Sequence, residues 1–369
     1  MGFYTSPSFF IALAAVSAPA VALGLAGRSA RGYGMVASWA MLALLFAGDP
    51  RGACAFALFV ATASVATYAV WRSWAREGGN RSMAVYRLAL AACLAPLVAC
   101  KVGAVFDCNL LGFIGISYAT FRAVQVVIEI RASDLAAPRP RSAYADLLAR
   151  GTMMLLAGAV LQLVLATVAR GFYDPASAPA GTLTVDALGL PAAAREVLRA
   201  YGYAVYLFCD FAGYSLMAMG ASACFGIETP ANFRAPYRAL DMKDFWNRWH
   251  ITLSTWLRDF VFMRFVRAAT KRKVFSSRLH TACAAYAVDM LLMGAWHGLT
   301  IDYLAYGAYH GVLLAATEVY QKRCGFHKRY RKKAWYRVLT WFVTLQLVVL
   351  GFALFSGQVS GLLARAFAA

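Results

Sequence analysis

Residues 338–357 read VLTWFVTLQLVVLGFALFSG, an apolar stretch of twenty residues that carries no charged side chain. A helix of about 17–25 mostly apolar residues is long enough to cross the hydrocarbon core of a bilayer. Comparable stretches occur along the whole chain, and the second of them is short. We predict membrane-spanning helices at 9–26, 34–48, 52–71, 88–106, 111–130, 151–169, 199–224, 282–299, 303–320 and 338–357.

The composition of the chain favours the same environment. Of its 369 residues, 61% are hydrophobic and only 14% are charged, and the mean hydropathy is +0.58. A soluble domain has about 45–50% apolar and about 25% charged residues, and one soluble core stops growing beyond roughly 250–300 residues. We therefore predict an all-α, polytopic integral membrane protein.

The distribution of basic residues predicts an orientation, because cytoplasmic loops carry an excess of Lys and Arg. If the N-terminus is outside, the inside loops hold 29 of the 36 Lys and Arg residues. These loops are 27–33, 72–87, 131–150, 225–281 and 321–337. We predict a multi-pass protein of the cell membrane with its N-terminus outside.

The net charge of +19 is compatible with two kinds of partner, nucleic acid and anionic lipid. The basic residues lie in short clusters between apolar runs and not on one soluble face, so we expect membrane lipids and no nucleic acid. The eight cysteines are scattered, mostly inside apolar runs, without a CxxC pair or a Cys/His cluster of metal-binding spacing. We therefore expect no metal site.

The segment 225–266 is too charged to span a membrane. From Asp241 it reads DMKDFWNRWHITLSTWLRDFVFMRFV, with apolar residues at helical spacing. Its three tryptophans belong to the residue type that prefers the membrane–water boundary. We predict an interfacial amphipathic helix at about 242–266. A polar row beside its aromatic face is our candidate for substrate binding, with a merely solvated stripe as the alternative; the row consists of Asn247, His250, Ser254 and Arg258.

A second group of polar residues surrounds the predicted span 282–299 and includes Asp289, Trp296, His297 and Asp302. Ionisable residues within spans cost about 2.5–3.5 kcal/mol each on insertion scales, so they usually mark function or pairing. An imidazole titrates near pH 6.5 and can take up and return a proton at neutral pH. We predict that His297 is a general base and that Trp296 contacts the substrate; an ordinary interfacial histidine is the alternative.

Four longer strings carry a resemblance to the membrane-bound O-acyltransferase (MBOAT) family. They cover much of the region 111–357 in the order that is typical of this family. The strings are GISYATFRAVQVVIEI (Gly115 to Ile130), CDFAGYSLMAMGASACFGIETPANFRAPY (Cys209 to Tyr237), DFWNRWHITLSTWLRDFVFMRF (Asp244 to Phe265) and GAWHGLTIDYLAYGAYHG (Gly294 to Gly311).

The resemblance implies a fold and a pair of histidines. The fold is a ring of tilted helices around a thin centre that a tunnel crosses, here as one membrane domain over 1–369 with peripheral spans in 1–110 and the family core in 111–357. His297, in its Trp-His context, maps to the catalytic residue, and His250 maps to a second histidine. A simple alternation of spans places His250 inside and His297 outside, whereas the family fold brings both towards a shared interior.

The strings are most similar to the D-alanyl transfer branch of the family. This branch implies that D-alanine leaves the phosphopantetheine thioester of an acidic cytosolic carrier protein and ends on an outside hydroxyl, with no cofactor bound by the chain itself. The acceptor is a teichoic acid, another glycopolymer or a relay protein. The carrier would meet a basic inside face, for which lipid headgroups are the alternative partner; this face consists of Arg264, Lys271, Arg272 and Lys273.

Two other functions compete with D-alanyl transfer. The first is alginate-type O-acetylation of an exopolysaccharide; against it, the chain continues after WLRDF as VFMRFVRAATKRK, without the Leu-Gly-Gly turn of that branch. The second is a transporter or flippase without catalysis, which predicts half-chain repeats. We find no internal repeat in the sequence.

Overall fold

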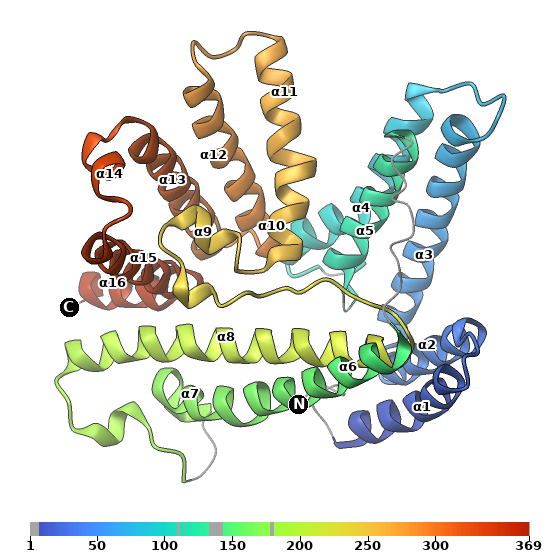
Figure 1. Ribbon diagram of the computed structural model, residues 1–369, viewed down its shortest axis with the longest axis horizontal. Helices are drawn as coiled ribbons and strands as arrows, with labels where there is room; N and C mark the ends of the chain where they lie inside the picture. Colours follow the sequence, from blue (N-terminus) through green and yellow to red (C-terminus); the bar gives the residue numbers. More distant parts are fainter. Residues whose placement is uncertain (1–6, 109–110, 114, 133–142, 178–180, 369) are drawn as a thin grey trace. The chain divides into compact units, whose positions relative to one another are not determined.

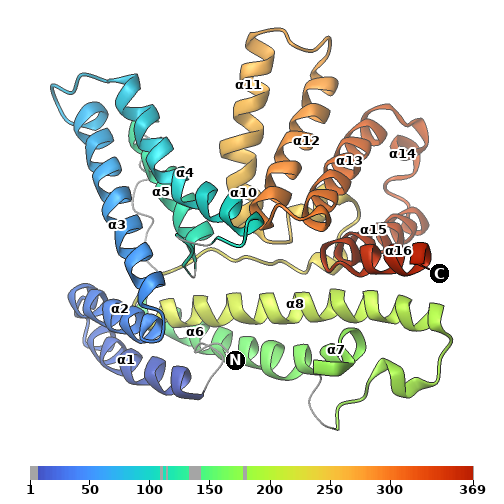
Figure 2. The same cartoon turned by 180° about the vertical axis from the view of Figure 1, so that it is seen from behind.

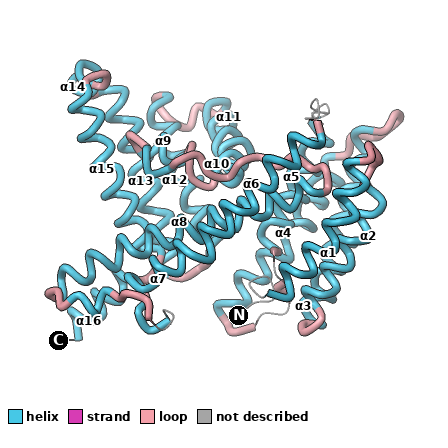
Figure 3. The backbone as a smooth tube through the Cα atoms, turned by 60° about the horizontal axis from the view of Figure 1, so that its bottom comes forward, coloured by secondary structure: helices cyan, strands magenta, loops and turns pink. Residues whose placement is uncertain are grey.

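The computed structural model describes residues 7–108, 111–113, 115–132, 143–177 and 181–368. These residues form helices joined by turns and loops, with no strand among them (Figure 3). The prediction of an all-α protein is confirmed. Half of the loop predicted at 131–150, residues 133–142, lies outside the described residues, and its end from Tyr144 belongs to a helix.

All ten predicted spans fall on helices. Within the described part of the chain, six helical segments are long and apolar enough to cross a membrane, so the chain is a multi-pass membrane protein. These six are Pro7–Leu25, Pro50–Ala75, Met83–Val105, Tyr144–Tyr173, Ala192–Cys224 and Ala334–Phe355. The helices at the predicted spans 282–299 and 303–320 are not among them. They carry buried polar residues, among them Asp289 and His310, and they hold the candidate site.

The chain divides into two compact units, Met1–Tyr144 and Ala145–Ala369. The division does not test the prediction of one membrane domain over 1–369, which stays a prediction. The helices of the first unit are α1 (Pro7–Leu25), α2 (Arg31–Phe46), α3 (Pro50–Val70) with the π-turn η2 (Trp71–Ala75), α4 (Met83–Val105) and α5 (Ile116–Ala132). Stacked and edge-on phenylalanines connect them, as in the pair Phe56 and Phe113, whose ring centroids are 5.4 Å apart.

The second unit is built on α8 (Ala192–Cys224), which lies alongside the helical segment from α6 to α7 (Figures 1 and 2). That segment consists of α6 (Tyr144–Ala159), the π-turn η3 (Val160–Leu165) and α7 (Ala166–Tyr173). Glycines allow the two backbones to touch, because a Cβ added at Gly158 would lie 2.6 Å from the Gly213 carbonyl oxygen. Close approach through small residues is typical of helix packing in membranes.

In the rest of the second unit, the helices Arg278–His297 and Ile301–Arg323 pack on each other, with Met263–Lys271 beside the first and Ala334–Phe355 beside the second (Figure 2). The helices of this part are α9 (Met242–Trp246), α10 (Ile251–Leu257), the π-turn η7 (Arg258–Phe262), α11 (Met263–Lys271), α12 (Arg278–His297), α13 (Ile301–Arg323), α14 (Gly325–Tyr330), α15 (Ala334–Phe355) and α16 (Gln358–Ala368). Short 3-10 turns occur at Pro175–Ser177, Val185–Leu188 and Pro236–Arg238.

The prediction of one continuous interfacial helix at about 242–266 is wrong. The helix stops after Trp246, and His250 adopts left-handed backbone angles of φ 45° and ψ 50° before α10 begins. A π-turn then shifts the register again at Arg258. The predicted polar row therefore does not form one stripe, since each break rotates the side chains that follow.

Candidate functional site

His250 is held at the break between α9 and α10 by a residue from the preceding loop. Its ring nitrogen Nδ1 lies 3.1 Å from Oδ1 of Asn232. The same oxygen accepts hydrogen bonds from the backbone N–H of Thr252 at 3.3 Å and from its hydroxyl at 2.9 Å. The edge of the His250 ring meets Phe211 of α8 with a centroid distance of 4.7 Å. Two elements therefore fix the position of this imidazole.

His297 is the last residue of α12, and aromatic rings surround it. The nearest ring of another helix is Phe355 of α15, edge-on, with a centroid distance of 4.9 Å. Tyr303 and Tyr306 of α13 lie at 5.9 Å and 6.3 Å. The ends of three helices thus enclose the imidazole in an environment of low polarity.

Trp296 connects the two histidines. Its ring centroid lies 4.6 Å from that of His297 and 6.2 Å from that of His250. The two predicted catalytic histidines therefore lie next to the same indole. Burial and, as the smaller effect, the His297 imidazole lower the pKa of His250 to about 3. His250, which lies outside the spanning helices, is consequently neutral at physiological pH.

The close crossing of α12 and α13 holds this arrangement in place. A Cβ added at Gly307 would lie 2.5 Å from the carbonyl oxygen of Met290 and 3.2 Å from the Cα of Gly294. Two glycines therefore let the helix that ends at His297 pack directly on the helix that carries Tyr303. Such contact leaves no room for a larger residue.

A third histidine lies beneath the site and was not singled out from the sequence. His310 of α13 is fully buried, and its Nδ1 accepts a hydrogen bond of 3.3 Å from the indole N–H of Trp246. Its position inside a predicted span was a signal that could have been used, because polar residues there usually have a role. Asn232 was also missed, and its place in a turn-rich loop gave no comparable signal.

A cavity of about 510 Å³ opens next to the aromatic enclosure of His297. Two of the residues that line it, Tyr303 and Phe355, also contact the His297 ring. The lining combines aromatic, charged and small polar residues: Tyr173, Asp174, Glu196, Arg199, Tyr203, Tyr303, Phe355, Ser356, Gly357, Gln358, Gly361 and Arg365.

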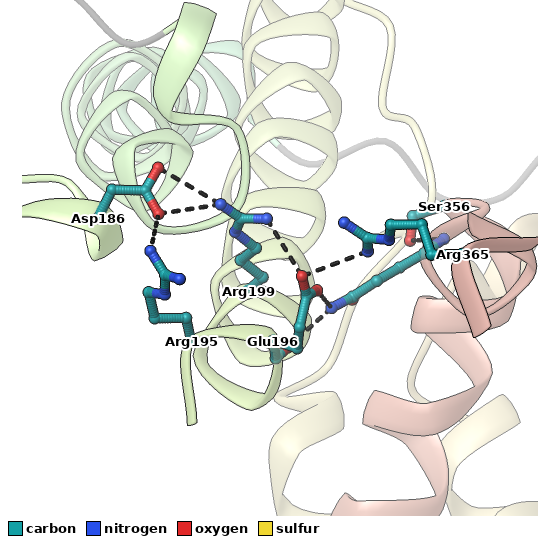
Figure 4. A network of polar contacts seen from close by, with 7 residues as sticks. Asp186, Arg195, Glu196, Arg199, Ser356 and Arg365 are labelled. Atoms are coloured by element: carbon teal, nitrogen blue, oxygen red, sulfur yellow. Dashed lines mark hydrogen bonds and ion pairs between the residues drawn. The ribbon is translucent and has the colours of Figure 1, made fainter. Parts of the chain in front are cut away.

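Several of the lining residues belong to one polar network, which Figure 4 shows. The carboxylate of Glu196 accepts hydrogen bonds from Arg199 at 3.3 Å, from Arg365 at 3.3 Å and from Gln358 at 3.0 Å. Arg199 also donates to Asp186 at 3.0 Å. The network joins α8 to α16 through charge-assisted hydrogen bonds, which are stronger than bonds between neutral groups.

The other predicted substrate-binding residues have different surroundings. Asn247 is exposed after α9, and Ser254 donates a hydrogen bond of 3.1 Å to the carbonyl of Trp249. Arg258 is exposed and paired with Asp259 at 2.8 Å. These side-chain contacts do not involve His250 or His297, and Ser254 meets His250 through its backbone N–H, which donates to the His250 carbonyl at 2.9 Å. The role of the three residues in substrate binding stays a prediction.

The predicted carrier face lies along α11 and the turn after it. Arg264, Lys271, Arg272 and Lys273 are all exposed. Arg264 places its guanidinium 5.9 Å from the ring centroid of Phe260. Among the residues that the structure describes, no group of three or more His, Cys, Asp or Glu residues could hold a metal ion. The predictions of a carrier face and of no metal site stay predictions.

Comparison with known proteins assigns the family. Residues 133–356 match the model of the membrane-bound O-acyltransferase family, MBOAT. The teichoic acid D-alanyltransferase of Bacillus subtilis (strain 168) is 32% identical, covering 96% of this chain and 98% of the relative. That of Lacticaseibacillus rhamnosus is 30% identical over 96% of both chains. The probable alginate O-acetylase AlgI of Pseudomonas syringae is 33% identical over only 47% of this chain and 30% of its own length. The chain belongs to the membrane-bound O-acyltransferase family and is an acyltransferase.

Proposed function

We propose that this acyltransferase moves a D-alanyl group from the phosphopantetheine thioester of a cytosolic carrier protein to a hydroxyl group of teichoic acid outside the cell membrane. The observation that carries the proposal is the position of Trp296, whose ring lies against both His250 and His297. His250 comes from a segment predicted to be inside, and His297 ends a helix predicted to reach the outside. One substrate passage can therefore serve a donor from one face and an acceptor from the other.

The similarity to relatives supports D-alanine as the transferred group and teichoic acid as the acceptor. Two relatives named teichoic acid D-alanyltransferase match this chain over nearly its whole length. The relatives named alginate O-acetylase match over stretches of 177 to 281 residues, 47% to 66% of this chain. A match that includes the peripheral helices favours D-alanyl transfer, since the core is common to both branches.

In the proposed reaction, His297 acts as the general base. Its imidazole takes the proton of the acceptor hydroxyl while the oxygen attacks the thioester carbonyl carbon. The C–S bond then breaks, and the leaving thiolate takes the proton back from His297. A positioned base contributes about 10²–10⁴-fold to the rate. A thioester is already reactive, so no covalent intermediate on a side chain is needed.

The cavity beside His297 is the proposed entrance for the acceptor. Tyr173, Tyr203 and Tyr303 offer aromatic faces, and Glu196 and Arg199 offer hydrogen-bonding groups. Polar groups placed among aromatic ones suit a polyhydroxylated chain. The carrier protein would approach the opposite, basic face at Lys271–Lys273, and the N-terminus would lie outside.

Reconstitution tests the proposal with matched donors and acceptors. Purified protein in vesicles is supplied with carrier-bound D-alanine or carrier-bound acetate, and with lipoteichoic acid or alginate as the acceptor. We expect loss of the D-alanyl thioester together with new D-alanyl esters on lipoteichoic acid. Acetate transfer to alginate without D-alanyl transfer would contradict the proposal and favour the acetylating branch. Movement of a substrate across the vesicle membrane without ester formation would favour a transporter.

A further inference from the structure

We propose that Asn232 is a positioning residue that keeps His250 in the tautomer with its proton on Nδ1, so that Nε2 is available only as a hydrogen-bond acceptor. The role of this tautomer in catalysis rests on the proposed function. The tautomer itself does not, because it follows from the hydrogen bonds around one oxygen atom.

The identity of the Asn232 atom that faces His250 is fixed by Thr252. The backbone N–H of Thr252 lies 3.3 Å from this atom and can only donate, so the atom must be the amide oxygen. The Asn232 amide nitrogen in turn donates to the hydroxyl of Ser215 at 3.2 Å. The Thr252 N–H excludes the flipped orientation of the amide, and the Ser215 hydroxyl, which can donate or accept, is compatible with this assignment.

The protonation of His250 follows from this orientation. An amide oxygen has lone pairs and no hydrogen, so it can only accept. The His250 Nδ1 that lies 3.1 Å from it must therefore carry the proton. In a neutral imidazole the other nitrogen, Nε2, then has the lone pair.

Backbone hydrogen bonds join the loop that carries Asn232 to the residues on both sides of His250. The Asn232 carbonyl accepts a hydrogen bond of 2.9 Å from the N–H of Ile251, and the N–H of Arg234 donates to the carbonyl of Arg248 at 2.9 Å. These bonds join the loop to both sides of His250. They also hold its left-handed φ of 45°, which is unfavourable for a residue with a side chain.

His310 provides a contrast within the same molecule. The indole N–H of Trp246 can only donate, so the His310 Nδ1 that it contacts at 3.3 Å must be the acceptor. Neutral His310 then carries its proton on Nε2. The structure thus assigns opposite tautomers to two histidines, and His310 serves as an internal reference.

The assignment changes what His250 can do in the reaction. A histidine with its proton on Nε2 could donate a hydrogen bond to the oxyanion of the intermediate. With a lone pair on Nε2, neutral His250 cannot donate there and instead accepts a hydrogen bond, for example from the acceptor hydroxyl or the thiol. It then orients a proton-bearing group next to His297.

Nuclear magnetic resonance of the full-length protein with labelled histidine rings tests the tautomer directly. The chain has only 5 histidines, so His250→Gln and His310→Gln identify the two signals. We expect His250 protonated at Nδ1 and His310 at Nε2. Asn232→Leu should give His250 a mixture of both tautomers, whereas Ser215→Ala, which leaves the Oδ1 contacts intact, should not. An Nε2-protonated His250 in the unchanged protein would overturn the inference, even if D-alanyl transfer is confirmed.

The pH dependence of the reaction tests the functional meaning. Asn232→Asp preserves the size and the acceptor but adds a negative charge, which favours the imidazolium and raises the pKa of His250 by about one to three units. The general base His297 sets the acid limb of the pH–rate profile, and a raised pKa of His250 makes this limb fall more steeply, since both histidines must be neutral. A role limited to folding would lower the rate equally at every pH. If Asn232→Leu does not fold, the nearly isosteric Asn232→Asp still tests the role, and an acid limb of unchanged steepness contradicts it.

Discussion

The rings of His250 and Trp296 lie with their centroids 6.2 Å apart, although a loop break positions one and the end of α12 positions the other. The break allows this meeting, because His250 turns back from the helical path with a left-handed backbone. The indole of Trp296 then leads on to His297 at 4.6 Å. The acceptor side and the donor side of the proposed reaction meet at this indole.

The Glu196 network should affect acceptor binding more than donor binding. Glu196→Gln weakens the bonds to Arg199 and Arg365 in the cavity wall. Because one hydrogen bond contributes about 0.5–1.5 kcal/mol net, we expect a roughly two- to ten-fold higher KM for the acceptor. The KM for the carrier thioester should not change. Glu228→Gln, which alters an exposed pair with Arg150 away from the cavity, is the control. If both variants change the KM for the acceptor equally, the Glu196 network does not contribute specifically to acceptor binding.

Two basic triplets with similar composition allow a test of the carrier face. Reversing the charges of Lys271, Arg272 and Lys273 to Glu should slow association with an acidic carrier, most strongly at low salt. The same reversal at 331–333, which are also exposed Arg and Lys residues, is the matched control. Stopped-flow association rates at two salt concentrations check the expectation. If carrier association is unchanged at low salt, the 271–273 charges contact lipid headgroups instead.

A methyl group added at the crossing of α12 and α13 should destabilise the protein. Gly307→Ala places a Cβ 2.5 Å from the Met290 carbonyl, so the helices must separate. Overpacking of this kind costs about 1–3 kcal/mol, and we expect a lower Tm together with a lower kcat, since α12 carries His297. Gly325→Ala is the control, because no described atom lies within 4 Å of its added Cβ. A Gly307→Ala protein with unchanged Tm would disprove the tight crossing.

The lowered pKa of His250 predicts a loss of stability in acid. Its folded-state pKa of about 3 lies below the unfolded value near 6.5, so the unfolded chain binds the proton more readily. The contribution of neutral His250 is therefore complete above about pH 6.5 and is lost as the pH falls towards 3. We expect His250→Gln to lose less Tm than the unchanged protein between about pH 7.5 and pH 5. An equal loss of Tm in both proteins would mean that His250 titrates normally.

The helices and the two histidines could be predicted from the sequence for simple physical reasons. The length of an apolar stretch reports a membrane crossing directly, so every predicted span falls on a helix. Polar residues in apolar surroundings stand out, and this drew attention to His297 and Asp289. His250 was noticed because its neighbours are aromatic and its row is polar.

The rest depends on contacts that leave no local pattern. The break at His250 is a single backbone angle, and helical spacing of the apolar residues continues through it. Asn232 lies 18 residues before His250 in a loop. Glu196 and Gln358 are 162 residues apart and meet only in the folded chain. Alternation of spans separates His250 from His297, and only the family resemblance implied that they come together; their common neighbour Trp296 is seen in the folded chain.

In the proposed reaction, the His297 imidazole removes the proton from the acceptor hydroxyl. The decisive measurement is the rate at which reconstituted protein transfers D-alanine from its carrier thioester to lipoteichoic acid. This rate is compared between the unchanged protein and His297→Ala, and the Tm of both proteins is measured to show that the variant is folded. We predict a fall of about 10²–10⁴-fold in kcat, with carrier binding retained. Transfer by His297→Ala at the rate of the unchanged protein would mean that His297 is not the general base.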